Sequence, residues 1–199
     1  MKTGAIEAMM HHAARLRTRM FTLLLAGQFA EFGRGSRIVP PLSFHGLNNI
    51  SVGEGVFINL DNWLNVVPGH GDEASVKIII KSRASIGRRS QITAALRIVI
   101  EKYVIVGSNC LISDHFHASN DLSVPIIAQG IDNIKPVYIG EGTQLGNNVS
   151  VQPGVTIGRH CVIGTNSIVS HSIPDFSIAV GMPARVVKTL TKHQIHEQF

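Results

Sequence analysis

Two histidines lie close together in a segment that interrupts an otherwise regular chain. His115 and His117 belong to the run SDHFHASND, within a stretch from residue 113 to residue 136. The unperturbed pKa of histidine lies close to neutral pH, so either ring could take a proton from an attacking group. The pair therefore predicts general-base chemistry, and the next question is what holds the two rings in place.

The chain around these histidines repeats every six residues. In the C-terminal third, large aliphatic residues recur at this interval: Ile139, Leu145, Val151, Ile157, Ile163 and Val169. Three positions after the first five stand the residues Gly142, Asn148, Gly154, His160 and Asn166, and the next positions hold Thr143, Val149, Val155, Cys161 and Ser167. Gly and Asn tolerate positive φ and can turn the chain at the same place in each repeat. The columns predict short strands wound into a three-sided coil of about 18 residues that stacks on itself.

The same period is present earlier in the chain, but it is less regular. Aliphatic residues recur at Ile80, Ile86, Ile92, Ile100, Val106 and Ile112, with one step of eight residues. Residues 60–76 break the period and predict a loop or an irregular coil. Residues 113–136 break it again, and a long loop leaving a regular repeat is a common place for function.

The first part of the chain has a different character. Residues 4–32 are rich in helix-forming residues without proline, which predicts a helix. Arg15, Arg17 and Arg19 lie beside Met20, Phe21 and Leu23–Leu25. Such a helix could dock on the rest of the protein or on a neighbouring subunit, or it could lie on an anionic membrane surface. The expected organisation is an N-terminal helical segment over 1–40, a repeat domain over 41–188, and a tail over 189–199 with a short helix.

Composition limits the classes of function. The 199 residues suit one domain, with 44% hydrophobic residues, 16% charged residues and a net charge of +5. The basic residues are spread singly, which does not favour a nucleic-acid partner. Cys110 and Cys161 form neither a disulfide framework nor a metal motif. Without a leader-like or membrane-spanning apolar stretch, we expect a cytoplasmic location, with peripheral contact at the inner face of the membrane left open.

Three segments resemble the hexapeptide-repeat acyltransferases, in particular the galactoside, maltose and polysaccharide O-acetyltransferases. They are IGEGTQLGNNVSVQPGVTIGRHCVIGTNSIV, IPDFSIAVGMPARVVK and ISDHFH. The resemblance implies a left-handed parallel β-helix, an exception to the usual right-handed crossover. It also implies a homotrimer with active sites between subunits, acetyl-CoA as acyl donor, and no metal.

The resemblance also implies roles for the two histidines. In the galactoside and maltose enzymes the catalytic histidine lies five positions after its core aliphatic residue. His117 stands five positions after Ile112, so it is preferred as the base. His115 stands three positions after Ile112, in the turn column, and could be a structural corner or the base.

For the donor, the family binds pantetheine along the coils and the nucleotide near the C-terminal motif. The matching residues are Gly146, Asn147 and Thr165 for the pantetheine arm, followed by Ser170 and His171, with Arg185 and Lys188 for the nucleotide end. Gln144 stands where many relatives have Trp, so packing around the thioester arm is expected to differ.

For the acceptor, the sequence departs from the galactoside enzyme. The position of its acceptor-binding asparagine falls on Gly87, followed by Arg88 and Arg89. Arg88 therefore indicates an anionic or polymeric acceptor. Trp63 could stack on a sugar ring or fill the core of an irregular coil, and the core position is preferred.

Together these features predict an acetyl-CoA-dependent O-acetyltransferase acting on a sugar hydroxyl, in a polysaccharide or its precursor. An N-acetyltransferase of an amino sugar is the nearest alternative on the same scaffold. A non-enzymatic β-helix scaffold or binding protein is a second alternative. A γ-class carbonic anhydrase needs three zinc-binding histidines, and the spacing of His115 and His117 does not provide them.

Overall fold

A computed structural model of the protein describes residues 3–190. The predicted turn column is confirmed, because Gly142, Asn148, Gly154, His160 and Asn166 all have φ between +50° and +79°. The aliphatic and small columns are confirmed as well, since every member of both is buried. The chain therefore turns at the predicted places and points the predicted side chains inward.

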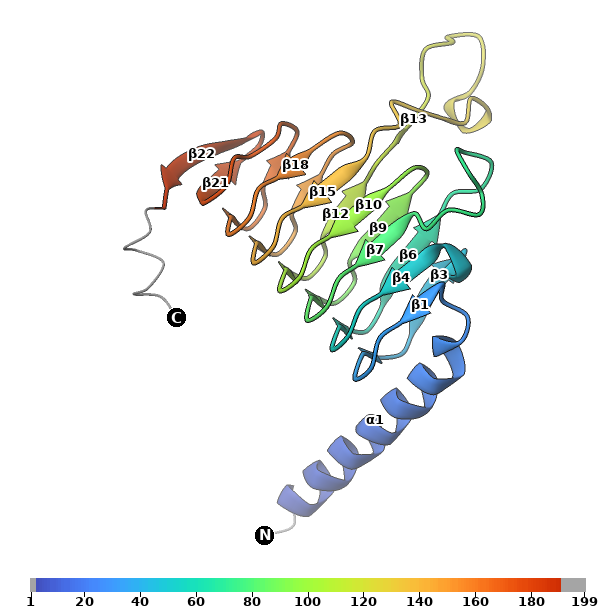
Figure 1. The fold of residues 1–199 in the computed structure, drawn as a ribbon, viewed down its shortest axis with the longest axis vertical. Coiled ribbons are helices and arrows are strands. Elements are labelled where there is room, and N and C mark those ends of the chain that lie inside the picture. The colour runs from blue at the N-terminus through green and yellow to red at the C-terminus, as the bar shows by residue number, and fades with distance from the viewer. Residues whose placement is uncertain (1–2, 191–199) are drawn as a thin grey trace.

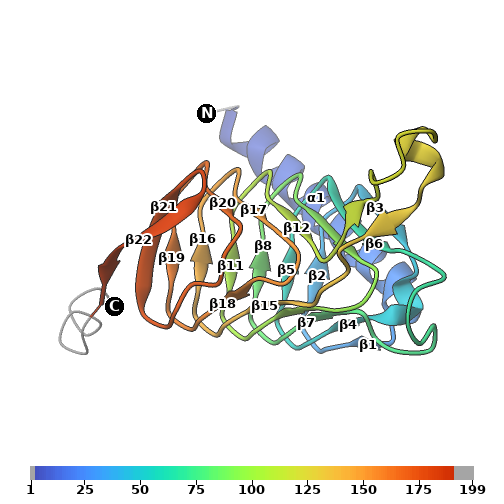
Figure 2. The same ribbon diagram turned by 90° about the horizontal axis from the view of Figure 1, so that it is seen from above.

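The coils form a left-handed parallel β-helix with three faces (Figures 1 and 2). The first sheet contains β1 (Glu31–Phe32), β4 (Ile50–Val52), β7 (Ile78–Ile80), β10 (Ile98–Ile100), β15 (Val137–Ile139) and β18 (Thr156–Ile157). The second contains β2 (Arg37–Ile38), β5 (Phe57–Ile58), β8 (Ser85–Ile86), β11 (Ile105–Val106), β16 (Gln144–Leu145), β19 (Val162–Ile163), β21 (Ser177–Gly181) and β22 (Ala184–Thr189). The third contains β3 (Leu42–His45), β6 (Asn62–Val66), β9 (Gln91–Ala94), β12 (Leu111–Ser113), β17 (Ser150–Val151) and β20 (Ile168–Val169).

Equivalent side chains stack in register along the inside of each sheet. In the second sheet the register aligns Ile58, Ile86, Val106, Leu145 and Ile163, and each is at most 1% exposed. β-branched and Leu side chains fill such a narrow interior because they pack well on a pleated surface. The core is one aliphatic column, and the polar side chains that could do chemistry lie on its outer faces.

The start of the repeat domain was predicted too late. The helix α1 spans Thr3–Ala26, not residues 4–32, and the first coil begins at Glu31 rather than near residue 41. This coil lacks the aliphatic six-residue period, and buried Phe29, Ile38 and Leu42 supply its part of the core. Without that period the coil could not be predicted from the sequence.

Residues 60–76 are also more regular than predicted. β6 occupies Asn62–Val66 as a full strand of the third sheet, and only the residues after it form a loop. Asn62 is buried at the corner, where its side chain donates to the carbonyl of Asn59 and accepts from the backbone N–H of Ser90. A polar residue thus takes an inward position that the aliphatic pattern could not reveal.

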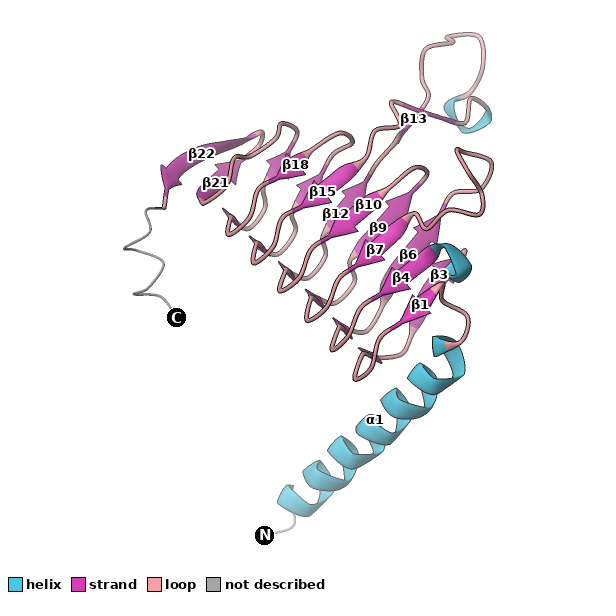
Figure 3. Ribbon diagram, viewed as in Figure 1, coloured by secondary structure: helices cyan, strands magenta, loops and turns pink. Residues whose placement is uncertain are grey.

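The two ends of the coil are covered differently. Figure 3 shows α1 at the N-terminal end of the coil. The helix packs against β2, where the buried Thr22 hydroxyl accepts from the backbone N–H of Ile38 at 2.9 Å. At the other end β22 pairs antiparallel with β21 and ends the parallel stack.

The short helix predicted in the tail falls mainly on 191–199, which lie outside the described residues. Within the described part of the chain, no helix is long and apolar enough to cross a membrane.

The predicted loop over 113–136 leaves the coil between β12 and β15. Within it, β13 (Phe116–His117) pairs antiparallel with β14 (Ile131–Asp132), and a 3-10 turn spans Ile126–Ala128. Figure 1 shows this excursion rising beyond the edge of the coil. It starts beside the outer face of the third sheet and carries both histidines there.

Candidate active site

A cleft of about 510 Å³ lies on the outer face of the third sheet, at the base of the 113–136 loop. The outward-facing side chains of β6, β9, β12 and β17 form its floor, and the start of the loop forms one wall. It is lined by Trp63, Asn65, Gln91, Thr93, Leu111, Ser113, His115, Phe116, His117, Ser150, Val151, Gln152 and Pro153. The structure therefore brings both predicted histidines and Trp63 to one site.

His115 is held by a buried carboxylate. Its Nδ1 lies 2.8 Å from Oδ1 of Asp114, whose side chain is fully buried, and the His115 side chain is 10% exposed. A carboxylate at Nδ1 fixes the tautomer with the proton on that nitrogen and leaves the Nε2 lone pair free. It also stabilises the imidazolium that forms when Nε2 takes a proton. His115 is thus arranged as a general base.

Asp114 is in turn held by the turn after β9. Its carboxylate accepts backbone N–H groups from Ala95 at 2.8 Å and from Leu96 and Arg97 at 2.7 Å each. Burial acts to raise the pKa of Asp114, but the hydrogen bonds from His115 and these amides outweigh it, so the pKa lies below its usual value. Asp114 is therefore ionised beside the imidazole at neutral pH.

His115 does not serve as a left-handed corner. It is absent from the described residues with positive φ, whereas Asn109 in its own coil and Gly154, at the same place on the following coil, have that conformation. The structural alternative for His115 is wrong, because the chain leaves the coil at Asp114 and makes no hexapeptide turn there.

His117 has a more open environment. It lies on β13 opposite Ile131, is exposed, and its ring makes no hydrogen bond to any other residue between 3 and 190. It faces the same cleft, so it can contact a bound molecule. No carboxylate fixes its tautomer, which distinguishes it from His115.

Trp63 faces outward and does not fill the core. It is 41% exposed on β6, while Asn62, Leu64 and Val66 on the same strand point inward. The prediction that Trp63 fills the core was therefore wrong. Inward and outward side chains alternate along β6, and the buried residue that starts the alternation is Asn62. Beside it, Asn65 Nδ2 donates to the Thr93 hydroxyl at 3.0 Å. An indole next to hydrogen-bonding groups suits the mixed apolar and polar faces of a sugar ring.

Arg88 is not part of this cleft within one chain. It lies in the turn between β8 and β9 and lines a different depression under α1. The prediction that Arg88 lines the acceptor site together with the histidines is therefore not met within a single chain.

The residues expected to hold the donor lie along one corner of the coil. Gly146 and Thr165 stack in successive turns so closely that a Cβ on Gly146 would lie 2.6 Å from the Thr165 nitrogen. Asn147 is exposed, and its Oδ1 accepts the backbone N–H of Ser108 at 2.8 Å. The corner offers close-packed backbone to an extended ligand such as pantetheine.

Arg185 and Lys188 lie on β22, both exposed, at the C-terminal end of the stack. Exposed cations there fit the phosphates of a nucleotide. In the described range 3–190 no group of three or more His, Cys, Asp or Glu side chains could hold a metal ion.

Asp114 is the site residue that sequence reasoning missed. Its signal was its place next to His115, but only the structure shows that it is buried and bonded to three amides. Gln91, Thr93 and Gln152 were missed too, because outward positions of a solenoid follow no column.

Comparisons with known proteins agree with the repeats and the fold. The family described as bacterial transferase hexapeptide (six repeats) matches residues 136–171. "Probable acetyltransferase Rv3034c" of Mycobacterium tuberculosis is 38% identical over 136 residues, covering 66% of this chain and 44% of that protein. The galactoside O-acetyltransferase of Escherichia coli is 26% identical over 179 residues, covering 88% of this chain and 71% of the relative. The chain spans about half the length of the first curated relatives that it matches.

Among solved structures, AntD of Bacillus cereus has the same fold, with a TM-score of 0.71 and 20% identity. The match covers 88% of this chain and 90% of AntD, described as an N-acyltransferase in complex with dTDP and 3-hydroxybutyryl-CoA. In its repeats, its sequence and its fold, the chain is therefore similar to hexapeptide-repeat acyltransferases.

Proposed function

We propose that the protein is an acetyl-CoA-dependent O-acetyltransferase that modifies a sugar hydroxyl, in a polysaccharide or its precursor. The observation that carries the proposal is the Asp114–His115 pair, which opens into a cleft that also contains Trp63. A pure scaffold needs neither a buried ionised carboxylate nor an imidazole oriented by it. The similarity to the galactoside O-acetyltransferase supports a sugar as acceptor.

In the proposed reaction, Nε2 of His115 takes the proton of the sugar hydroxyl as its oxygen attacks the thioester carbonyl. The tetrahedral intermediate collapses, the carbon–sulfur bond breaks, and His115 gives its proton to the leaving sulfur. The products are the acetyl ester and free coenzyme A, and the base is restored. Asp114 lowers the energy of the imidazolium between the two proton transfers.

The base assignment is tested with two histidine variants. We expect His115→Ala to lower kcat by about 100-fold or more, the usual contribution of a positioned base. His117→Ala should lower turnover less than about tenfold, through acceptor binding, since no carboxylate orients its ring. Turnover is read as thiol released from acetyl-CoA, with coenzyme A binding as the control for folding. The opposite order of losses would make His117 the base, as the spacing to Ile112 predicts.

The acceptor is identified with a panel of free sugars, nucleotide sugars and polysaccharides. We expect Trp63→Ala to raise KM for the acceptor and Trp63→Phe to retain most of the affinity, because stacking needs only an aromatic face. Unchanged kinetics in Trp63→Ala would remove the indole from the acceptor site.

N-acylation of an amino sugar is the second candidate, and the fold shared with AntD is the observation behind it. Amino sugars in the same panel decide between oxygen and nitrogen. If no acceptor released thiol and the protein also failed to bind coenzyme A, the acyltransferase proposal would fail in favour of a non-enzymatic scaffold.

We further propose a homotrimer, in line with the family resemblance, with donor contacts from Gly146, Asn147, Thr165, Arg185 and Lys188. Light scattering gives the mass of the assembly, and Arg185→Gln with Lys188→Gln should weaken coenzyme A binding. Three times the chain mass and weaker binding are the expected results.

We place the protein in the cytoplasm with α1 in contact with an anionic membrane surface. The side of α1 away from the coil exposes Met9, Leu16 and Met20, each at least 53% exposed. Arg15, Arg17 and Arg19 flank this stripe, an arrangement typical of interfacial helices. Leu16→Gln with Met20→Gln should abolish sedimentation with vesicles that contain phosphatidylglycerol. Loss of trimers instead would mean that the stripe joins subunits.

A further inference from the structure

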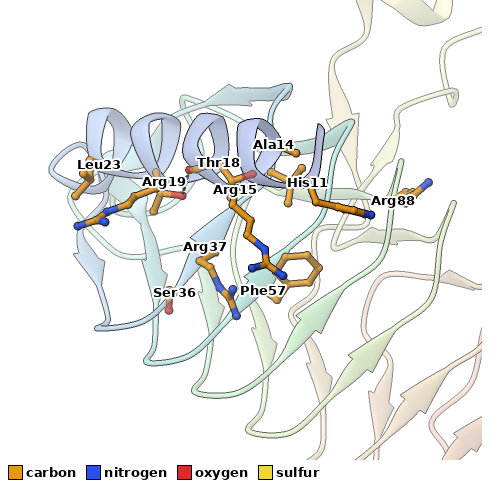
Figure 4. Close-up of a pocket in the computed structure, with 12 residues that line it drawn as sticks. His11, Ala14, Arg15, Thr18, Arg19, Leu23, Ser36, Arg37, Phe57 and Arg88 are labelled. Carbon is orange, nitrogen blue, oxygen red and sulfur yellow. Dashed lines mark hydrogen bonds between the residues drawn. The ribbon is translucent and has the colours of Figure 1, made fainter. Parts of the chain in front are cut away.

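A second depression lies between α1 and the outer face of the second sheet, separate from the histidines. Its volume is about 680 Å³, and its lining includes Arg15 and Arg19 from α1, Arg37 from β2 and Arg88 from the turn after β8 (Figure 4). His11 lies at one side. We call this depression the arginine groove.

The charge in the arginine groove is not balanced by the chain itself. No Asp or Glu lines it, and none of its four arginines forms an ion pair within residues 3–190. Cations that share one groove repel each other, because the low-dielectric walls screen them less than bulk water does. An anion bound between them would remove this repulsion.

Two of the guanidinium groups come from separate elements and lie near the ring of Phe57. Arg15 extends from α1 beside this ring, and Arg37 lies on β2 near it, whereas Arg19 and Arg88 lie at opposite ends of the groove (Figure 4). The guanidinium carbon of Arg37 lies 6.0 Å from the centre of the Phe57 ring. Contact with an aromatic face limits the orientations of the planar fork, which suits two-point binding of phosphate oxygens.

The rest of the lining shows what accompanies the anion. Ala14, Leu23, Val39 and Phe57 give the groove a mainly apolar wall, and Thr18 and Ser36 add hydroxyl groups. The groove therefore fits a phosphate ester with an attached organic group better than a small inorganic ion.

We propose that the arginine groove is a binding site for the phosphate group of a phosphate ester. This site lies outside the cleft, and its existence does not depend on the acetyl transfer proposed above. The ester can be a soluble molecule or a phospholipid headgroup, and the two sources share the phosphate group that the arginines would bind.

The proposal is tested by calorimetric titration of the full chain with inorganic pyrophosphate. Arg15→Gln and Arg37→Gln each remove one charge from the groove, and we expect each to weaken binding about tenfold or more, as for a lost charge-assisted hydrogen bond. Arg17→Gln is the matched control, because it removes one charge from the same helix but does not line the groove. It should weaken binding less than about twofold. Equal losses in all three variants would show binding to net charge alone and would overturn the proposal.

A second measurement separates the two sources. Vesicles of phosphatidylcholine with phosphatidylglycerol are sedimented with the wild type and the same variants, with and without pyrophosphate. Binding that depends on Arg15 and Arg37 more than on Arg17, and that pyrophosphate displaces, supports the site and assigns the lipid headgroup. Pyrophosphate binding without such displacement supports the site and assigns a soluble ester. If neither pyrophosphate nor vesicles distinguish the groove variants from Arg17→Gln, the site does not exist.

Discussion

Replacing Asp114 by Asn tests the link between the fold and the proposed chemistry. The side chain keeps its shape but has one oxygen instead of two. With that oxygen in the place of Oδ2, it still accepts from Leu96 and Arg97. The new amide group then faces the N–H of Ala95 and the Nδ1 of His115, two groups that formerly donated to Oδ1.

Two effects of different size follow from this geometry. The Ala95 N–H loses its acceptor, and an unsatisfied buried donor costs about 1–3 kcal/mol of unfolding free energy. The amide can donate to Nδ1 only if the ring proton moves to Nε2, which leaves no lone pair toward the cleft. We therefore expect kcat to fall by about 10²–10⁴ in Asp114→Asn, the range for loss of a general base.

The assay is thiol release from acetyl-CoA beside urea denaturation and coenzyme A binding. Asp121→Asn is the matched control, because Asp121 lies in the same loop but is exposed and bonded only within the loop. The control should retain activity within about twofold. A folded Asp114→Asn that binds coenzyme A and keeps half its turnover would refute the role of the carboxylate, and His117 would then be the better candidate.

Three further predictions concern stability and reactivity. Because folding lowers the pKa of Asp114, its ionised carboxylate contributes fully to the unfolding free energy above the ordinary aspartate pKa of about 3.9, and this contribution is lost as the pH falls through the lower folded value. The unfolding free energy of the wild type should therefore fall more steeply below about pH 4 than that of Asp114→Asn. Equal slopes in urea titrations would contradict this. Gly146→Ala puts a Cβ 2.6 Å from the Thr165 nitrogen, so adjacent coils must separate. We expect urea unfolding to show a loss of about 2 kcal/mol or more of unfolding free energy, by analogy with overpacked cores. Gly27→Ala is the control, because its Cβ meets no neighbour within 4 Å. Burial raises the pKa of the Cys110 and Cys161 thiols; both should react with a thiol reagent at pH 8 only after unfolding, and fast labelling of the native protein would show that the coil opens.

The C-terminal coils could be predicted almost residue by residue because each turn there uses Gly, Asn or His in the left-handed conformation. The earlier coils put Arg83, Arg89, Tyr103 and, near the end, Phe176 in the same conformation. These side chains give no conformational signal, and backbone hydrogen bonds to the neighbouring coil hold them there. The first coil was missed because it lacks the aliphatic period, and β6 was misread because the polar Asn62 takes an inward position.

The site was predictable only in part. A histidine pair in a loop that breaks a repeat could be found from spacing, but the choice between His115 and His117 depends on Asp114. That carboxylate matters because the turn of Ala95–Arg97, on the preceding coil, gives it three amides. Trp63 and Arg88 were ambiguous for the same reason, since their surroundings come from neighbouring coils and from α1.

The loop that carries the histidines places little demand on the coil beneath it. Leu111 pairs with Gln91, 20 positions earlier, and with Ser150, 39 positions later, in the same ladder. Doubling the length of a closed loop costs only about 0.6 kcal/mol. The segment between Asp114 and Lys135 can therefore lengthen, shorten or change composition over evolutionary time while the stack keeps its register. Under the proposed function, acceptor preference can diversify in this loop at almost no expense to folding. The corner of Gly146 and Thr165, which is proposed to hold the donor, is built into the stack itself and must change slowly.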